Sequence, residues 1–499
     1  MVERRSGLML TVKTADLKKT KMDTLAVPVC QDKNIYKDTG IKAAAKKALS
    51  LKEFKGEKDE TVTLYDLPGI NARRVIFGGL GQFEKIDREV LRTMAGKTVK
   101  GFIQQGTANL WFAVPEMKIN GLETSSVLKA MQEGAYLGNH LFDRYKGDKS
   151  KKPLKQINFR VAASAVRKLR PISKKVAAVC EGTTLAREWI NIPANDKTPE
   201  KFARSIAGQA KKQGLKVRIL NQTQLKQKKF GALLAVAAGS QNKPSLVILE
   251  HKVPGAKKSI ALVGKGVTFD SGGLNIKTGG SMAAMKSDMF GAAAVAATLI
   301  SAAKIKPQFN LIGAIPIVEN MPSGKATRPG DIIRSYAGKT IEIGNTDAEG
   351  RLILIDAISY VVKTYQPQFL IDVATLTGAC VVALGEKIAG VFSNDEDLAS
   401  AIIAAGEKTH ERCWRMPLPE DYKELLKSEF ADMNNIGSTR WGGAIAAALF
   451  LSEFTADTPW AHIDIAGPAY RSKGSAYCGA GGTGFGVRLL AELLDRLAA

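Results

Sequence analysis

The stretch Val263-Gly264-Lys265-Gly266-Val267-Thr268-Phe269-Asp270-Ser271-Gly272-Gly273-Leu274-Asn275-Ile276-Lys277 carries an aspartate and two lysines on glycine-bracketed turns inside apolar sequence. A second stretch, Asn345-Thr346-Asp347-Ala348-Glu349-Gly350-Arg351-Leu352, adds two carboxylates and an arginine. Buried charge of this density is costly unless something neutralises it. We therefore predict that the two stretches together hold a pair of divalent metal ions.

Apolar runs around these turns predict strands and helices in alternation. We expect strands at 259–264, 310–318, 339–343, 369–375 and 460–465, and helices at 283–303, 350–365 and 485–497. Such alternation is typical of an α/β fold with a mostly parallel sheet flanked by helices. Ligands bind outside the carboxyl ends of the strands in these sheets. The charged residues follow predicted strands, except Asp288, which we place on the helix after the first strand.

The N-terminal part of the chain predicts a smaller α/β domain. Short apolar runs at 24–29, 74–79 and 110–114 alternate with helix-like stretches at 41–51 and 125–137. A basic stretch then leads into a helix predicted at 174–190. We therefore predict three parts: an N-terminal α/β domain at 1–165, a connecting helix at 166–190 and a catalytic domain at 191–499.

The metal ligands are expected to be carboxylates, because none of the four histidines lies in a motif and no HExxH sequence occurs. Carboxylate oxygens suit Mg, Mn or Zn. The candidate ligands are Asp270, Asp288, Asp347 and Glu349. If two ions share four carboxylates, two carboxylates must bridge, and ions about 3.5–4 Å apart can act on one carbonyl. A single aspartate in such a loop is more often a helix N-cap or a surface group, so the prediction rests on the whole set.

The three cations of the two stretches have different expected roles. Lys265 beside two metal ions would lose its proton, because nearby positive charge and desolvation both favour the neutral amine, which can then ligate. Lys277 and Arg351 would instead stay charged and face the negative charge that develops in a transition state.

These motifs resemble those of the leucyl aminopeptidase family, the cytosolic M17 metallopeptidases. Residues 264–270 and 271–277 agree with the family in spacing, and 345–352 (NTDAEGRL) is its highly specific signature octapeptide. Asn191-Ile192-Pro193-Ala194-Asn195 is similar to the start of the family's catalytic domain, and Thr375-Leu376-Thr377-Gly378 to its active-site strand end. The likeness covers residues 170–499, whereas the first 150 residues are only generically similar.

The resemblance implies a metal-dependent exopeptidase that removes Leu and other apolar residues from peptides with a free N-terminus. It implies two divalent ions per subunit, Mn or Zn with Mg as an alternative, held by Lys265, Asp270, Asp288, Asp347 and Glu349. By the same resemblance Lys277 and Arg351 are catalytic, and Arg351 holds a bicarbonate that serves as general base. The family also forms homohexamers, so self-association is expected.

One position departs from the family. Members often carry acids between the two methionines that precede Asp288, where this chain has Ala283 and Ala284. These are not ligand positions, so the departure bears on substrate preference. Met285 and its neighbours would line an apolar pocket for the first side chain of the substrate, or would simply fill the core.

Charge and cysteine content indicate a cytoplasmic protein with an unusual basic excess. The net charge is +24, and residues 1–170 hold 33 Lys and Arg against 18 Asp and Glu, an excess of +15. The start lacks an apolar signal core, we find no apolar run near 18 residues, and the five cysteines are scattered. Basic surface favours solubility and non-specific attraction. A DNA-binding footprint is the alternative, since some family members bind DNA.

Two other functions stay open from the residues alone. Two carboxylate-held metals also serve phosphoester hydrolysis, so a hydrolase of another bond is the alternative enzyme. The glycine-rich segment 479–486 before the last helix suggests phosphate binding, but it lacks the GK[ST] ending and the GxGxxG spacing. We therefore interpret it as a close-packed loop.

Overall fold

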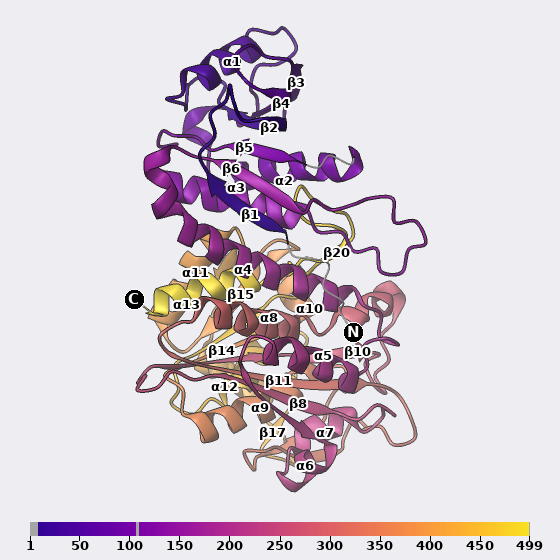
Figure 1. Ribbon diagram of the computed structural model, residues 1–499. Coiled ribbons are helices and arrows are strands. Elements are labelled where there is room, and N and C mark those ends of the chain that lie inside the picture. Colours follow the sequence, from indigo (N-terminus) through magenta and orange to yellow (C-terminus); the bar gives the residue numbers. More distant parts are fainter. Residues whose placement is uncertain (1–7, 106–108, 499) are drawn as a thin grey trace. The chain divides into compact units, whose positions relative to one another are not determined.

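The structure is a computed structural model that describes residues 8–105 and 109–498. This part of the chain divides into two compact units, coloured along the sequence in Figure 1. The N-terminal unit runs to Glu181 and includes Lys473–Gly479, and the C-terminal unit comprises Gly182–Ser472 and residues 480–498. Helix α4 (Val166–Asn191) crosses the division. The domain boundaries expected from the sequence, 165 and 191, remain a prediction.

Helix α4 runs over Val166–Asn191, in agreement with the connecting helix predicted at 166–190, and so begins before residue 174. A basic segment that contains a proline, here Pro171, has only a weak preference for helix. Leu169 is nevertheless buried in the N-terminal core, and Ile172 packs against that core. Burial of these apolar side chains outweighs the weak local preference of the segment for helix.

The N-terminal unit contains a sheet with strand order β1-β6-β5-β2-β4-β3. Its strands are β1 (Met9–Lys13), β2 (Met22–Val29), β3 (Thr61–Tyr65), β4 (Ala72–Gly79), β5 (Leu110–Ala113) and β6 (Gln156–Arg160). All neighbouring pairs are parallel except the antiparallel edge pair of β3 and β4. The helices are α1 (Thr39–Leu49), α2 (Arg88–Gln105) and α3 (Thr124–Gly138), with short 3₁₀ turns η1 (Phe83–Lys85) and η2 (Ala163–Ala165).

A segment from near the C-terminus of the chain belongs to this N-terminal unit. The Tyr477 hydroxyl donates to Glu89 of α2 (2.8 Å), and Lys100 Nζ donates to the Ser475 carbonyl (2.6 Å). Gly96 of α2 allows the close approach, because a Cβ there would lie 2.7 Å from Cβ of Tyr477. The segment is flanked by β19 (Tyr470–Arg471) and β20 (Gly481–Gly482).

The C-terminal unit contains a larger sheet with order β16-β15-β18-β14-β9-β11-β8-β7, and β10 pairs with β11. Its strands are β7 (Lys216–Asn221), β8 (Ser245–His251), β9 (Ser259–Gly264), β10 (Gly266–Asp270), β11 (Asn310–Asn320), β14 (Phe369–Ala374), β15 (Ala389–Ser393), β16 (Cys413–Arg415) and β18 (Trp460–Asp464). The central strands β11, β9, β14 and β18 are parallel, whereas β8 and β15 join them antiparallel. The predicted α/β fold with a mostly parallel sheet is therefore confirmed.

Helices cover both faces of this sheet, as Figure 1 shows. One core is formed with α5 (Pro199–Lys211), α8 (Phe290–Ile305), α11 (Glu396–Thr409) and α13 (Val487–Ala498). The core on the other face is formed with α7 (Gly231–Ala237), α9 (Glu349–Tyr365), α12 (Gly443–Ser452) and the 3₁₀ turn η4 (Glu420–Leu426). The remaining elements are α6 (Gln222–Gln227), α10 (Gly378–Leu384), η3 (Gly279–Ser287) and a small sheet of β12 (Ile332–Arg334), β13 (Thr340–Glu342) and β17 (Met433–Asn434).

The helix predicted at 283–303 is wrong in one important detail. The 3₁₀ segment η3 ends at Ser287 and α8 begins at Phe290, so the chain breaks at Asp288 and Met289. The Asp288 main chain is held outside the helix, because its carbonyl accepts a hydrogen bond from Val267 N (3.2 Å) of β10. Asp288 therefore lies on a turn between two helical segments and not on the helix.

The segment Gly279–Ile305 is also long and apolar enough, by length and composition, to cross a membrane. The expectation that no such run occurs was therefore wrong. In its most apolar window 89% of the residues are buried inside the protein, as is typical of a core helix. Its composition is explained by the packing of α8 between the sheet and α13.

Candidate metal centre

The two charged stretches meet at the carboxyl ends of the central strands. Lys265 lies between β9 and β10, Asp270 ends β10, and Glu349 begins α9. Asn275 and Thr346 join the two stretches, since each accepts the other's main-chain N–H at 2.9 Å. Gly350 makes room for Lys265, because a Cβ there would lie 2.6 Å from Lys265 Cε. The juxtaposition that the sequence predicts is therefore present.

Lys265 is buried among acidic groups. Its Nζ lies 2.9 Å from Asp288 Oδ2 and 2.8 Å from Glu349 Oε1, and it donates to the Thr375 carbonyl at 2.8 Å. Burial lowers the pKa of this ammonium, but the carboxylates around it outweigh burial and raise the pKa above its ordinary value.

Lys277 holds the other half of the cluster. Its Nζ lies 2.7 Å from Asp270 Oδ2 and 2.5 Å from Asp347 Oδ1. Burial lowers the pKa of Lys277, but the charge of Asp270 and hydrogen bonds to Asp270 and Asp347 raise it overall. The ammonium is therefore charged at neutral pH.

The carboxylates outnumber the lysines that touch them. Asp270, Asp347 and Glu349 bring one oxygen each within 4.8 Å of one another, and Asp288 joins them through Lys265. Burial raises the pKa of Asp270, Asp288 and Asp347. Both lysine and carboxylate pKa values therefore shift upwards, which means that the site favours added positive charge.

Lysine ammonium groups face several of the buried carboxylate oxygens. Asp288 Oδ2 and Glu349 Oε1 share the Lys265 ammonium, and Asp347 Oδ1 shares the Lys277 ammonium with Asp270. Four carboxylates around two ammonium groups leave excess negative charge, which is costly to bury unless a cation neutralises it. A donor set of carboxylate oxygens and one amine fits Mg, Mn or Zn.

Arg351 is buried on the first turn of α9. Its Nη1 donates to the Asn435 carbonyl at 2.7 Å, while its Nε has no hydrogen-bond partner in the described structure. Burial lowers the pKa of the guanidinium to about 10, so the group stays charged at neutral pH. Arg351 is thus a charged donor with unused capacity beside the carboxylate cluster.

Two asparagines that sequence reasoning missed hold the site together. Asn320, at the end of β11, donates to Asp270 Oδ1 (2.9 Å) and to the Thr346 carbonyl (3.1 Å). Asn435 accepts from Gly344 N (2.8 Å) and donates to the Asn345 carbonyl (2.8 Å). The strand-end rule could have found Asn320, whereas Asn435 follows the very short β17 and gives no such signal.

Thr375 and Asp464 complete the supports. The Thr375 hydroxyl donates to Asp288 Oδ1 at 2.7 Å, and Thr375 lies directly after β14. Asp464, the last residue of β18, accepts from Leu376 N (3.2 Å) and from the Thr377 hydroxyl (2.7 Å). The segment 375–378 singled out in the sequence is therefore fixed from two neighbouring strands.

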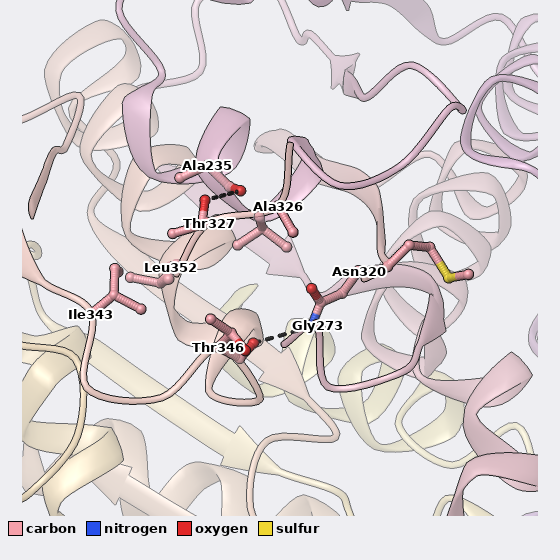
Figure 2. Close-up of a pocket in the computed structure, with 10 residues that line it drawn as sticks. Ala235, Gly273, Asn320, Ala326, Thr327, Ile343, Thr346 and Leu352 are labelled. Atoms are coloured by element: carbon pink, nitrogen blue, oxygen red, sulfur yellow. Dashed lines mark hydrogen bonds between the residues drawn. The ribbon is translucent and has the colours of Figure 1, made fainter. Parts of the chain in front are cut away.

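A small pocket lies behind the turns that carry the ligands (Figure 2). Its wall includes Gly273, Asn320 and Thr346 on one side, and Ala326 and Thr327 on the other. Figure 2 shows the hydrogen bond by which Thr327 is tied to the Ala235 carbonyl (2.7 Å). The pocket thus borders the main chain that supports Asp270 and Asp347.

Comparison with known proteins finds similarity over most of the chain. The model of the cytosol aminopeptidase family, catalytic domain, matches residues 184–491, and that of the family's N-terminal domain matches 26–149. A protein of Syntrophotalea carbinolica named "Probable cytosol aminopeptidase" is 43% identical, over 95% of this chain and 97% of its own length. Another of that name from Chlorobium limicola is 41% identical, over 98% and 99%. A solved structure titled "Bottromycin maturation enzyme BotP in complex with Mn" has TM-score 0.84 at 34% identity, over 96% of this chain and 100% of that one.

Proposed function

Because the chain belongs to the cytosol aminopeptidase family, we propose that it is a two-metal aminopeptidase that prefers peptides with N-terminal Leu or another apolar residue. Membership of the family makes the chain a peptidase that acts at N-termini. The observation that carries the proposed metal dependence is the cluster of Asp270, Asp347 and Glu349, with its excess negative charge, beside Lys265. The proposed leucine preference follows from the resemblance to the leucyl aminopeptidases alone.

The residues present fit two divalent ions. The excess of four carboxylates over two lysines and the upward pKa shifts both favour cations at this place. One ion would be held by Lys265, Asp270, Asp288 and Glu349 and the other by Asp270, Asp347 and Glu349, so that Asp270 and Glu349 would serve both ions. When bound, such a pair polarises a carbonyl and lowers the pKa of water. The similar structure solved with Mn supports Mn, with Zn and Mg as alternatives.

Lys265 changes its role when cations bind. Without metal, the negative charge of the surrounding carboxylates raises the pKa of Lys265 and keeps its amine protonated. Two divalent cations reverse the sign of that field, so the amine would lose its proton and offer its lone pair. Thr375, which accepts from Lys265 and donates to Asp288, keeps both groups aimed at one place.

Lys277 and Arg351 are assigned to catalysis. Lys277 remains an ammonium held between Asp270 and Asp347, where it would stabilise negative charge that develops on the substrate oxygen. Arg351 keeps a buried donor without a partner, and we propose that it orients an anion such as bicarbonate as the proton acceptor. Asn435 fixes the direction of the Arg351 guanidinium.

The family also suggests a homohexamer located in the cytoplasm, and we include both in the proposal. Sedimentation velocity at several protein concentrations measures the oligomeric state. A mass of one subunit at all concentrations would remove it without affecting the proposed chemistry.

The test is hydrolysis of Leu-p-nitroanilide by protein stripped with a chelator and then supplied with Mn, Zn or Mg. We expect activity only with metal, and none on N-acetyl-Leu-p-nitroanilide, because a free amine is needed to engage the site. Full activity in metal-free protein would remove the metal proposal. Equal rates on the acetylated substrate would remove the aminopeptidase proposal. An arm with p-nitrophenyl phosphate tests the alternative phosphoester chemistry.

A further inference from the structure

Lys197 carries a buried amine that the proposed chemistry does not use. It lies in the short connection between α4 and α5, and only 3% of its surface is exposed. Four neutral acceptors lie within hydrogen-bond distance of its Nζ and share its N–H groups: the carbonyls of Trp189 (2.9 Å), Ile190 (3.2 Å) and Lys286 (2.9 Å), and the sulfur of Met289 (3.2 Å). Within the described residues no carboxylate pairs with it.

Such a group is expensive to bury. An ammonium without a counter-ion loses its hydration and gains no ion pair. Burial, together with the charge of Lys286, holds the pKa of Lys197 well below its usual range. A methionine or leucine would fill the same space without this cost. The nitrogen is therefore retained for the hydrogen bonds that it donates.

Two of these hydrogen bonds reach the end of a helix. Trp189 and Ile190 lie in the last turn of α4, which ends at Asn191. Carbonyls of a last turn have no partner inside the helix and carry the negative end of its dipole. They form a fixed anchor for the Lys197 nitrogen.

The other two acceptors stand on either side of a proposed metal ligand. Lys286 precedes Asp288 by two residues and Met289 follows it, at the break between η3 and α8. At this turn the helical hydrogen bonds end, with Asp288 N donating to the Met285 carbonyl at 3.3 Å. Tertiary contacts add to it, and those of Asp288 itself are to Val267 N, the Thr375 hydroxyl and Lys265 Nζ.

We propose that Lys197 is a positioning residue that aims the Asp288 carboxylate, by fastening the Lys286 carbonyl before it and the Met289 side chain after it to the end of α4. The inference rests on the proposed function, since Asp288 has this importance only as a metal ligand. Residues that orient ligands in this way typically change metal affinity by about 10- to 100-fold when they are removed. If Lys197 only stabilised the connection between α4 and α5, its replacement would lower stability and leave the metal site unchanged.

The decisive experiment compares Lys197→Met with Arg488→Met in the full-length protein. Arg488 is a buried basic residue of the same unit, on α13, where it pairs with Glu411 (3.2 Å) and donates to the Thr409 carbonyl (2.7 Å). Backbone hydrogen exchange of metal-free protein is read at residues 285–292. Mn²⁺ affinity is read by competition with a fluorescent chelator.

We expect Lys197→Met to speed exchange at 285–292 and to weaken Mn²⁺ binding by about 10-fold or more, as for other residues that orient metal ligands. Arg488→Met should lower Tm and leave both readouts at their wild-type values. If Lys197→Met lowers Tm but changes neither readout, Lys197 is only a structural joint and the proposal is overturned. If Lys197→Met does not fold, Lys197→Gln, which keeps N–H donors on a shorter side chain, should give smaller shifts in the same direction.

The exchange measurement separates this inference from the proposed function. It uses metal-free protein, so it reports on the turn at Asp288 whether or not the site binds Mn²⁺. Wild-type protein that neither binds metal nor cleaves Leu-p-nitroanilide would remove the proposed function. Unchanged exchange at 285–292 in the Lys197 variants would remove only the role of Lys197.

Discussion

Both units place charged side chains at the carboxyl ends of parallel strands, and the two edges differ in how far those charges are balanced. In the N-terminal unit Arg160, the last residue of β6, pairs with Asp38 (2.5 Å) and approaches Glu116 (3.6 Å). Glu116 also accepts from Lys37 N (2.8 Å), and Asp38 accepts from Ile41 N (3.0 Å) at the start of α1. These contacts leave the edge internally satisfied.

The corresponding edge of the C-terminal unit is unbalanced. Four carboxylates share the two ammonium groups of Lys265 and Lys277, so negative charge is in excess. The rule that ligands bind at strand ends thus locates two candidate places in this protein. Only the residual negative charge indicates that one of them needs a ligand.

The largest expected effect comes from removing one charge at the unbalanced edge. Glu349→Gln should lose bound metal and reduce kcat/KM on the order of 10³-fold, because a bridging carboxylate neutralises both ions. The matched change at the balanced edge, Glu116→Gln, should leave activity of the folded enzyme unchanged. Metal content by mass spectrometry and Leu-p-nitroanilide kinetics measure both. A Glu349→Gln protein that keeps two metals would show that this carboxylate is not a bridge.

The arginines of the two edges provide the second comparison. Arg351→Ala should keep both metals and lose about 10²-fold in kcat, as for loss of one electrostatic group in the transition state. Arg160→Ala should instead lower stability by about 1–3 kcal/mol, because it leaves acidic groups unpaired, and should not change kcat. Urea unfolding and steady-state kinetics separate the two effects. Loss of metal in Arg351→Ala would mean that it helps to hold ligands.

The pH dependence of metal binding tests the excess charge directly. The pKa values of Lys265, Asp270 and Asp288 are raised, so the metal-free site retains protons that a cation must displace. Metal affinity should therefore rise as pH rises, by about tenfold per pH unit for each proton released. Calorimetry with Mn²⁺ at pH 6 to 8, in two buffers of different ionisation enthalpy, counts these protons. Affinity that does not change with pH would contradict the proposed ligand set.

The smallest effect concerns DNA, towards which the basic excess of residues 1–170 should give weak and non-specific attraction. Binding should fall with salt at a slope of about −0.9 per phosphate contacted. A mobility shift at about 150 mM salt should give equal affinity for a candidate promoter and for random duplex, because charge alone carries no sequence information. Glu349→Gln should bind DNA like the wild type. A preference for the promoter would instead indicate specific recognition.

Much of the site was predictable because its residues lie in short local motifs. The strand at 259–264 and the helix that begins beside Glu349 both form as predicted, within one residue. The sequence Asn345–Leu352 needs only one turn to bring Asp347, Glu349 and Arg351 to one strand end. Local hydrophobic pattern and turn residues determine such features.

The break at Asp288 was not predictable in the same way. Residues 282–303 are rich in alanine and methionine, which favour a continuous helix. At this break the Asp288 carbonyl accepts from Val267 N, and the Lys286 carbonyl accepts from the Lys197 side chain, which is distant in sequence. These contacts favour a turn over a continuous helix. Tertiary contacts routinely override helix propensity, which amounts to less than about 1 kcal/mol per residue for ordinary side chains.

The sequence by itself determined the family, the alternation of strands and helices, and the set of charged residues that would gather at one sheet edge. These depend on local spacing and on apolar periodicity, which are written along the chain. Only the tertiary structure decided which charges remain unbalanced. It also decided that Asn320 and Asn435 hydrogen-bond to the ligand turns, and that Lys197 donates to the Lys286 carbonyl beside Asp288. Charge balance and hydrogen-bond satisfaction depend on groups far apart in the sequence, so they exist only once the chain has folded.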